Sequence, residues 1–170
     1  MLGKKSRWIA PLAATAAVLL AASSAGAADP EPDTTIPAVD SCGDFDLGLS
    51  ATDGKFNVVE FENGTFYSVG TGVILTWSNE GLGEEEGNGK TYTVKTSGSV
   101  SKYTENPDGT WTLTATGHNG FVYFESDDVE PGAYQYTGRV VVQIESLATF
   151  KVTSVDVTGG KAVDICALLR

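Results

Sequence analysis

Residues 110–116 read Thr-Trp-Thr-Leu-Thr-Ala-Thr, and this stretch decides the fold class. Trp111, Leu113 and Ala115 alternate with threonines, and a period of two is the pattern of a β-strand with one dry face and one wet face. The same alternation occurs in Thr-Tyr-Thr-Val-Lys at residues 91–95. Both stretches therefore predict strands that cover a hydrophobic core with one face.

Further short runs rich in Val, Thr, Tyr and Phe follow one another through the chain and are predicted to be strands: 55–61, 65–69, 73–78, 99–104, 120–125, 133–136, 138–145, 149–157 and 162–169. Turn residues separate them, as in Asn63-Gly64, Asn106-Pro107-Asp108-Gly109, Pro131-Gly132 and Gly159-Gly160. We expect an antiparallel β-sandwich of roughly eight to ten strands. A closed β-barrel is the alternative, because closure also removes exposed strand edges.

The segment Gly81–Gly89 interrupts this pattern. It holds four glycines and the run Glu84-Glu85-Glu86, and it has no apolar period. Glycine and like-charged residues in such number predict a long mobile loop rather than a strand.

The beginning of the chain has the pattern of an export signal. Lys4, Lys5 and Arg7 precede an apolar stretch at 8–22, and the small residues Ala25-Gly26-Ala27 follow. This predicts a signal peptide at 1–27 that is cleaved after Ala27, with an uncleaved anchor as the alternative. The apolar stretch is shorter than the ~20 residues of a membrane span. We therefore expect a secreted, extracellular protein with no membrane span in the mature chain.

The rest of the chain divides into two parts. Residues 28–40 contain three prolines and no aromatic residue, and they predict an acidic, extended leader. Residues 41–170 are enough for one β-sandwich domain with a single core. Cys42 and Cys166, the two cysteines, lie near the ends of this domain. In an exported chain such a pair predicts a disulfide, which would join both ends of the fold.

The chain is strongly acidic, with a formal charge of −11 and a pI near 4.3. Nucleic acids and anionic lipids bind chiefly through Lys and Arg, so this charge argues against both as partners. Carbohydrate or protein partners remain open. Acidity by itself is commonly a means of staying soluble.

Residues suited to catalysis occur without a recognisable catalytic motif. His118 is the single histidine and stands at what the sequence indicates is a turn; neither a Gly-x-Ser-x-Gly elbow nor a second histidine for zinc is present. The carboxylates of Glu60 and Glu62, and of Glu125 and Asp127, have the spacing of one strand face, so a small hydrolase using an acid pair stays an alternative. No catalytic residue is assigned.

Acidic loop residues are the type of ligand that calcium prefers, and they occur at Asp44 and Asp46, at 84–86, and at 127–130. None has the spacing of a known calcium loop, so neither a metal nor another cofactor is assigned. Exposed aromatic rings stack on sugars, and Tyr134 and Tyr136 after Pro131-Gly132 are the predicted ligand-binding ladder.

Three stretches resemble segments of small secreted actinobacterial β-sandwich proteins of unknown function: Gly-Lys-Thr-Tyr-Thr-Val at 89–94, Asn-Pro-Asp-Gly-Thr-Trp-Thr-Leu at 106–113, and Tyr-Thr-Gly-Arg-Val at 136–140. The resemblance implies a fold and an extracellular address, and no catalytic residue. Together these observations favour a secreted, non-enzymatic binding or structural module at the cell envelope or outside the cell. The alternatives are an acid-pair hydrolase and an envelope protein that associates with itself through its sheet edges.

Overall fold

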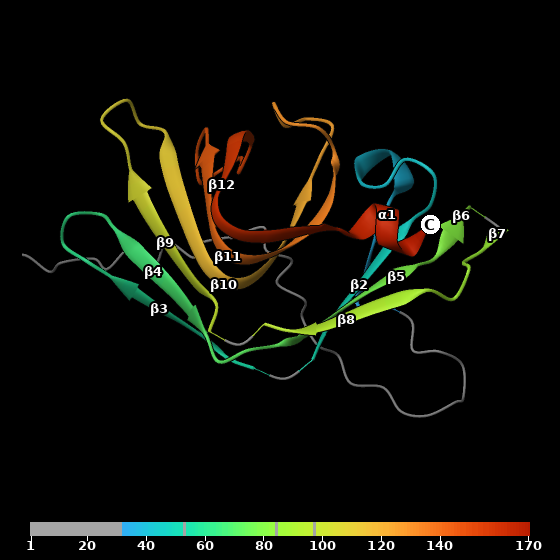
Figure 1. Ribbon diagram of the computed structural model, residues 1–170. Helices are drawn as coiled ribbons and strands as arrows, with labels where there is room; N and C mark the ends of the chain where they lie inside the picture. Colours follow the sequence, from blue (N-terminus) through green and yellow to red (C-terminus); the bar gives the residue numbers. More distant parts are fainter. Residues whose placement is uncertain (1–31, 53, 84, 97) are drawn as a thin grey trace, which may run out of the picture.

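The computed structural model describes residues 32–170 except positions 53, 84 and 97, and it shows an all-β protein with one short α-helix (Figure 1). The predicted signal peptide at 1–27 lies outside the described residues. In chain order the elements are β1 (Thr34–Ile36), the 3-10 helix η1 (Ala38–Asp40), β2 (Leu47–Thr52), β3 (Phe56–Glu60), β4 (Phe66–Gly70), β5 (Ile74–Asn79), β6 (Gly81–Leu82), β7 (Glu85–Glu86), β8 (Thr91–Lys95), β9 (Val100–Glu105), β10 (Trp111–Tyr123), β11 (Gly132–Ile144), β12 (Val152–Asp164) and α1 (Ile165–Leu169).

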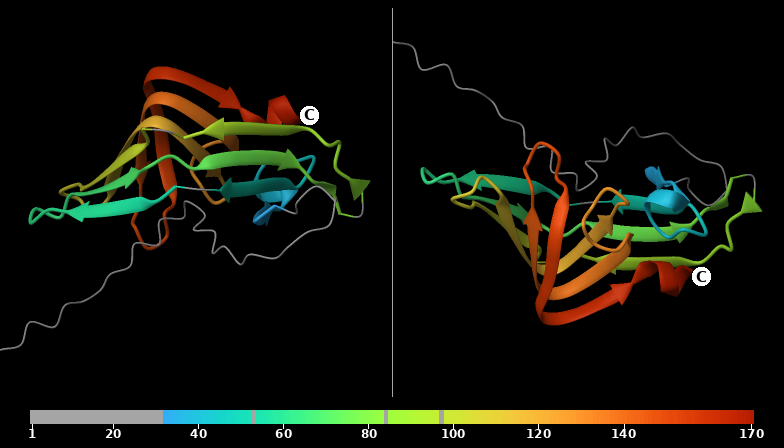
Figure 2. Two further views of the ribbon diagram at one scale, coloured as in Figure 1. Left: turned by 90° about the horizontal axis from the view of Figure 1, so that it is seen from below. Right: turned by 90° about the horizontal axis from the view of Figure 1, so that it is seen from above.

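Two main antiparallel sheets and the short β6–β7 ladder make up the fold, which confirms the predicted sandwich. A four-stranded sheet has the order β1-β2-β5-β8, and a six-stranded sheet has the order β12-β11-β10-β9-β4-β3. In the described part of the chain both sheets are open, with edge strands at each side, so the barrel alternative is wrong. Figure 2 shows the hairpin of β3 and β4 at the end of the molecule opposite α1.

The four-stranded sheet packs on one face of β10 and β11, and we call the buried layer between them the inter-sheet core. It contains Ile36, Cys42, Phe45, Leu47, Leu49, Trp77, Ala133, Ile165, Cys166 and Leu169. A side chain at Gly120 of β10 would overlap the rings and methyls of Trp77 and Leu75. Glycine at this position therefore allows the two sheets to approach closely.

The other face of the six-stranded sheet forms a second cluster, which we call the bend core. Its buried members are Tyr103, Leu113, Ala115, Tyr123, Tyr136, Val140, Val142, Ile144 and Val152. Leu113 and Tyr123 lie on the same face of β10 but near its two ends, and they belong to one cluster because the long strands curve back over this face (Figure 1).

A row of glycines lies where the long strands bend. Gly117, Gly138 and Gly160 are direct cross-strand neighbours on β10, β11 and β12, and all three have positive φ. A Cβ atom at Gly138 would overlap the carbonyl of Gly159, and one at Gly160 would overlap the carbonyl of Thr137. The bend therefore depends on three glycines that meet across the sheet.

Because β10, β11 and β12 are longer than predicted, several element boundaries expected from the sequence are wrong. The predicted turn around His118 is wrong, because β10 continues through it opposite Thr137. Gly159-Gly160 is likewise inside β12 and does not separate two strands. The segment 162–169, predicted as a strand, ends instead in helix α1, whose first turn is capped by the carboxylate of Asp164 accepting from the amide of Ala167.

The amino-terminal part of the fold also differs from the sequence-based boundaries. β1 lies within the segment 28–40 predicted as leader, and it pairs with β2, a strand that the sequence did not indicate. The folded region therefore includes Thr34–Ile36 as well as the domain predicted from residue 41. The predicted loop at 81–89 contains the small ladder of β6 and β7.

The predicted disulfide is confirmed. Cys42 and Cys166 are joined with a Cα–Cα distance of 5.2 Å across 124 positions of sequence. The bridge ties α1 to the segment that follows η1, and both half-cystines lie in the inter-sheet core. A disulfide of this kind fits an oxidising environment outside the cytosol. Among the described residues, no helix has the length and apolarity needed to cross a membrane.

Candidate functional site

The predicted aromatic ladder is largely inside the protein. Tyr136 is only 5% exposed, and its hydroxyl accepts a 3.1 Å hydrogen bond from that of Tyr123. Tyr134 is partly buried and stacks against Tyr136 with ring centroids 6.1 Å apart. Phe121 contacts the edge of the Tyr136 ring. The expected exposure of the ladder is therefore wrong for Tyr136, because the curvature of β10 and β11 encloses its ring in the bend core.

His118 does not form a catalytic arrangement with other side chains. It lies in the middle of β10, partly buried, and its Nδ1 is buried without a hydrogen-bond partner in the described part of the structure. Its strand neighbour Asn119 instead accepts a hydrogen bond from the hydroxyl of Ser99. The described residues thus supply no hydrogen-bonded acid or nucleophile at the Nδ1 of His118.

The predicted acid pairs lie at the end of β3 and in the β10–β11 connection. Glu60 is the last residue of β3, whereas Glu62 lies in the turn after it. The carboxylate of Asp127 accepts hydrogen bonds from the backbone amides of Phe124 and Val152, at 2.8 and 2.7 Å. This fixes the β10–β11 connection against the start of β12. Asp127 thus acts as a loop clamp, which its sequence spacing from Glu125 did not indicate.

Two further loop acids have partners in the fold. Asp46 accepts from the amide of Ala38 at 2.8 Å, and Asp128 pairs with Lys151 at 2.7 Å. Within the described residues, no three His, Cys, Asp or Glu side chains come together as a metal-binding group. Glu84 lies outside those residues.

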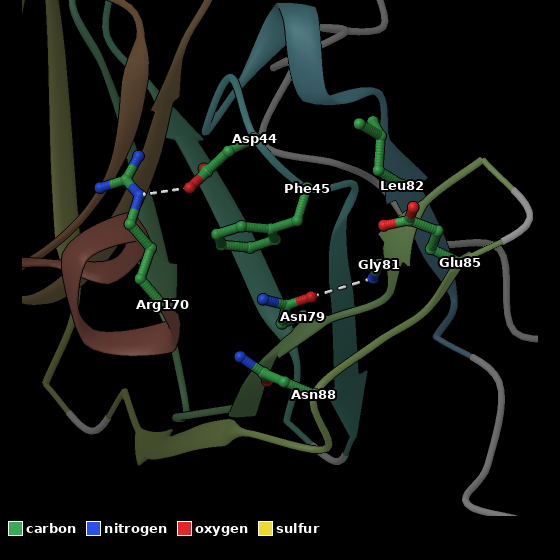
Figure 3. A pocket seen from close by; sticks show the side chains of 8 residues that line it. All are labelled: Asp44, Phe45, Asn79, Gly81, Leu82, Glu85, Asn88 and Arg170. Atoms are coloured by element: carbon green, nitrogen blue, oxygen red, sulfur yellow. Dashed lines mark hydrogen bonds and ion pairs between the residues drawn. The ribbon is translucent and has the colours of Figure 1, made fainter.

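A shallow cavity of about 280 Å³ lies where the C-terminal helix meets the four-stranded sheet (Figure 3). Its lining includes the ion pair of Arg170 with Asp44, 2.7 Å long, which holds the pKa of that carboxyl below its usual range. The side-chain amides of Asn79 and Asn88 both donate a hydrogen bond to the backbone carbonyl of Leu169. These interactions hold α1 against the sheet, so the polar groups of the cavity that form them have a structural role.

The four sheet edges differ in how they are protected against pairing with another chain. β1 has only three residues, and β8 carries Lys95 and contacts α1. β12 carries Asp156 and Lys161 and has two register shifts against β11. Short length, charge and bulges are the usual means of blocking an edge.

Within the part of the chain that the structure describes, β3 has none of these protections over most of its length. Its pairing with β4 is regular over five residue pairs, and Asn57, Val58 and Val59 are uncharged. Val58 is 47% exposed on one face and Val59 48% on the other, and Phe61 just beyond the strand is 53% exposed. We call Phe56–Glu60 with its outward backbone the β3 edge, and it is the candidate interaction site.

Neighbouring residues extend this apolar surface onto β4. Val59 lies opposite Tyr67 in the ladder, and Asn57 lies opposite Val69, which is 37% exposed. Tyr67 meets Phe61 edge to face at 5.6 Å between ring centroids. The predicted Asn63-Gly64 turn is confirmed between these strands: Gly64 has φ +80°, and the side chain of Asn63 accepts from the amide of Thr65.

The sequence predicted a strand at 55–61 but did not single it out as a site. The available signal was the adjacent pair Val58-Val59, which breaks the alternation of wet and dry residues and leaves an apolar side chain on each face. Such a pair also fits a strand buried on both faces, and only the sheet order shows that β3 is an edge.

Comparison of the chain with protein-family models, with curated proteins and with solved structures finds no match.

Proposed function

We propose that this chain is a secreted, non-enzymatic module that binds a protein partner outside the cell or at the cell envelope by adding a strand of that partner to the β3 edge. The observation that carries the proposal is the exposure of Val58 and Val59 on opposite faces of an unprotected edge strand. Strand addition uses free main-chain groups for affinity and side-chain contacts for specificity.

The extracellular address rests on the signal-peptide pattern at 1–27 and fits the Cys42–Cys166 bridge. A protein partner is preferred to a carbohydrate because the β3 edge offers a row of main-chain donors and acceptors to an added strand, whereas Tyr136 of the predicted sugar-binding ladder is enclosed. It is preferred to catalysis because the carboxylate of Asp127 is held by the backbone amides of Phe124 and Val152.

A labelled peptide of about eight residues with Val and Thr in alternation tests the proposal, because it can pair with any free edge strand. The expected result is a rise in fluorescence anisotropy on adding the oxidised mature protein. In amide NMR spectra, the resonances of residues 56, 58 and 60 should shift.

Val58→Lys places a charge at the centre of the β3 edge and should abolish peptide binding. Val157→Lys is the matched control, because Val157 is 41% exposed on β12 at the opposite edge of the same sheet. Equal binding by both variants, or no binding by the unmodified protein, would contradict strand addition at β3.

A further inference from the structure

The backbone of β3 has free hydrogen-bonding groups at alternate residues. The amide of Phe61 donates to the carbonyl of Thr65, and the amide of Thr71 donates to that of Lys55, so odd-numbered residues of β3 face β4. The amides and carbonyls of residues 56, 58 and 60 consequently point away from the sheet. Three evenly spaced residues thus offer donors and acceptors to an added strand.

This row is symmetric about Val58. In an antiparallel pair related by a two-fold axis perpendicular to the sheet, opposite residues lie on the same face, and one residue lies opposite its own copy. With Val58 at the centre, each of the five residues of β3 meets a partner: 56 with 60, 57 with 59, and 58 with itself. Any other centre leaves part of the strand unpaired.

The charges at the two ends of β3 disfavour other arrangements. Lys55 precedes β3, while Glu60 and Glu62 stand at its other end. Antiparallel pairing about Val58 puts Lys55 opposite Phe61 and Glu60 opposite Phe56 of the other copy, so no two like charges are directly opposite. Parallel pairing, or a centre at Glu60, would set Glu60 against Glu60.

From these features we infer that the partner on the β3 edge is a second copy of this chain, paired antiparallel about Val58 to give one continuous sheet across a two-fold dimer. The inference rests on the proposed function, since it names the occupant of the same edge. The two apolar surfaces formed by Val59, Phe61 and Val69 then lie side by side on one face of the joined sheet, which shields valine side chains that are half exposed in one copy.

Sedimentation velocity over a wide range of protein concentration tests the dimer. The expected result is a reversible monomer–dimer equilibrium for the oxidised mature protein. Val58→Lys sets two ammonium groups opposite each other at the two-fold axis and should weaken association by more than about tenfold. Val157→Lys adds the same charge at the other edge and should leave the dimer unchanged.

Cysteine substitution tests the register. Residues that form a hydrogen-bonded antiparallel pair have Cα atoms about 5.5 Å apart, a separation that suits a disulfide. Val58→Cys should therefore oxidise rapidly to a covalent dimer, and the native cysteines do not compete because they already form a bridge. Val69→Cys is the control on β4, and it should cross-link much more slowly.

The outcomes separate the two proposals. If the protein is monomeric at all concentrations but still binds the Val-Thr peptide at β3, the inferred dimer is wrong and the proposed function stands. A monomer that binds no peptide would overturn both. A dimer that is equally stable in Val58→Lys would place self-association elsewhere and contradict this interface.

Discussion

Two tyrosine hydroxyls in the bend core share a single hydrogen bond. Tyr123 and Tyr136 are 3% and 5% exposed, and the hydroxyl of Tyr123 donates to that of Tyr136. Tyr136→Phe leaves the Tyr123 hydroxyl buried without its acceptor and should lower the free energy of unfolding by about 1–3 kcal/mol. In the double variant Tyr123→Phe/Tyr136→Phe both polar groups are gone, so the loss should be smaller than in the single variant.

Denaturant unfolding of the two variants and the parent protein measures this difference. A double variant that is less stable than Tyr136→Phe would contradict this expectation. It would show that the Tyr123 hydroxyl stabilises the fold even without its bond to Tyr136.

Tyr103, in the same core, makes stability depend on alkaline pH. Burial raises the pKa of its hydroxyl to about 12, from an ordinary value of 10.0. Since the folded state keeps the proton more strongly than the unfolded state, the stabilising contribution is complete below pH 10 and is lost as the pH rises towards 12. Burial also raises the pKa of Tyr123, so both tyrosines act in one direction.

Tyr103→Phe removes one of these titrating groups. Its free energy of unfolding should therefore fall less steeply than that of the parent protein between pH 10 and pH 12. Unfolding curves at several alkaline pH values measure the slope, with pH 7 as the reference for any packing effect. Parallel slopes for the two proteins would contradict the assignment to Tyr103.

At the scale of elements, the glycine row of β10–β12 sets the curvature of the sheet. Gly138→Ala introduces a Cβ that overlaps the carbonyl of Gly159 at a backbone φ of +111°, so it should destabilise by several kcal/mol. Gly109→Ala is a matched control: its φ is +86°, but nothing lies within 4 Å of the added Cβ. It should cost only about 1–2 kcal/mol.

Thermal and denaturant unfolding of both variants measures the difference. Equal losses would mean that positive φ alone, and not the approach of neighbouring strands, requires glycine at position 138.

The sequence predicted elements well where one face is dry and the other wet. The alternation at Trp111, Leu113 and Ala115 marked the first half of β10, and the turn at Asn63-Gly64 was correct. β2 was missed because Leu47–Thr52 contains no valine, isoleucine or aromatic residue, although Leu47, Leu49 and Ala51 alternate with smaller or polar residues. The sequence did not show that β10 continues through Gly117, because a glycine usually indicates a turn. Only the pairing of Gly117 with Gly138 on the neighbouring strand shows that this glycine lies inside a strand.

The candidate site could be predicted only in part. The strand at 55–61 was expected, but its position at an edge depends on β4 pairing with β9, a contact between segments far apart in the chain. Tyr134 and Tyr136 were singled out because they follow the turn signal Pro131-Gly132. Gln135 between them is buried, since its face of β11 belongs to the inter-sheet side.

At the scale of the whole molecule, the Cys42–Cys166 bridge closes a loop that includes nearly all of the described fold. Cys42→Ser/Cys166→Ser should lower the free energy of unfolding by up to about 4–5 kcal/mol, because the unfolded chain regains the freedom that the loop removes. Guanidinium unfolding of the variant, beside the parent protein with and without a reducing agent, measures the loss. Unchanged stability in both the reduced protein and the variant would show that α1 docks without help from the bridge.

The curvature of the long strands has a further consequence for how the molecule comes apart. β10 and β11 contribute residues to both cores: Leu113 and Val140 to the bend core, and Gly120 and Ala133 to the inter-sheet side. If β10 and β11 separate, both cores lose residues that pack in them. The two clusters are therefore not independent folding units, although they share no buried residue. The chain should therefore melt in a single cooperative transition, and damage in one cluster should be felt as faster hydrogen exchange in the other.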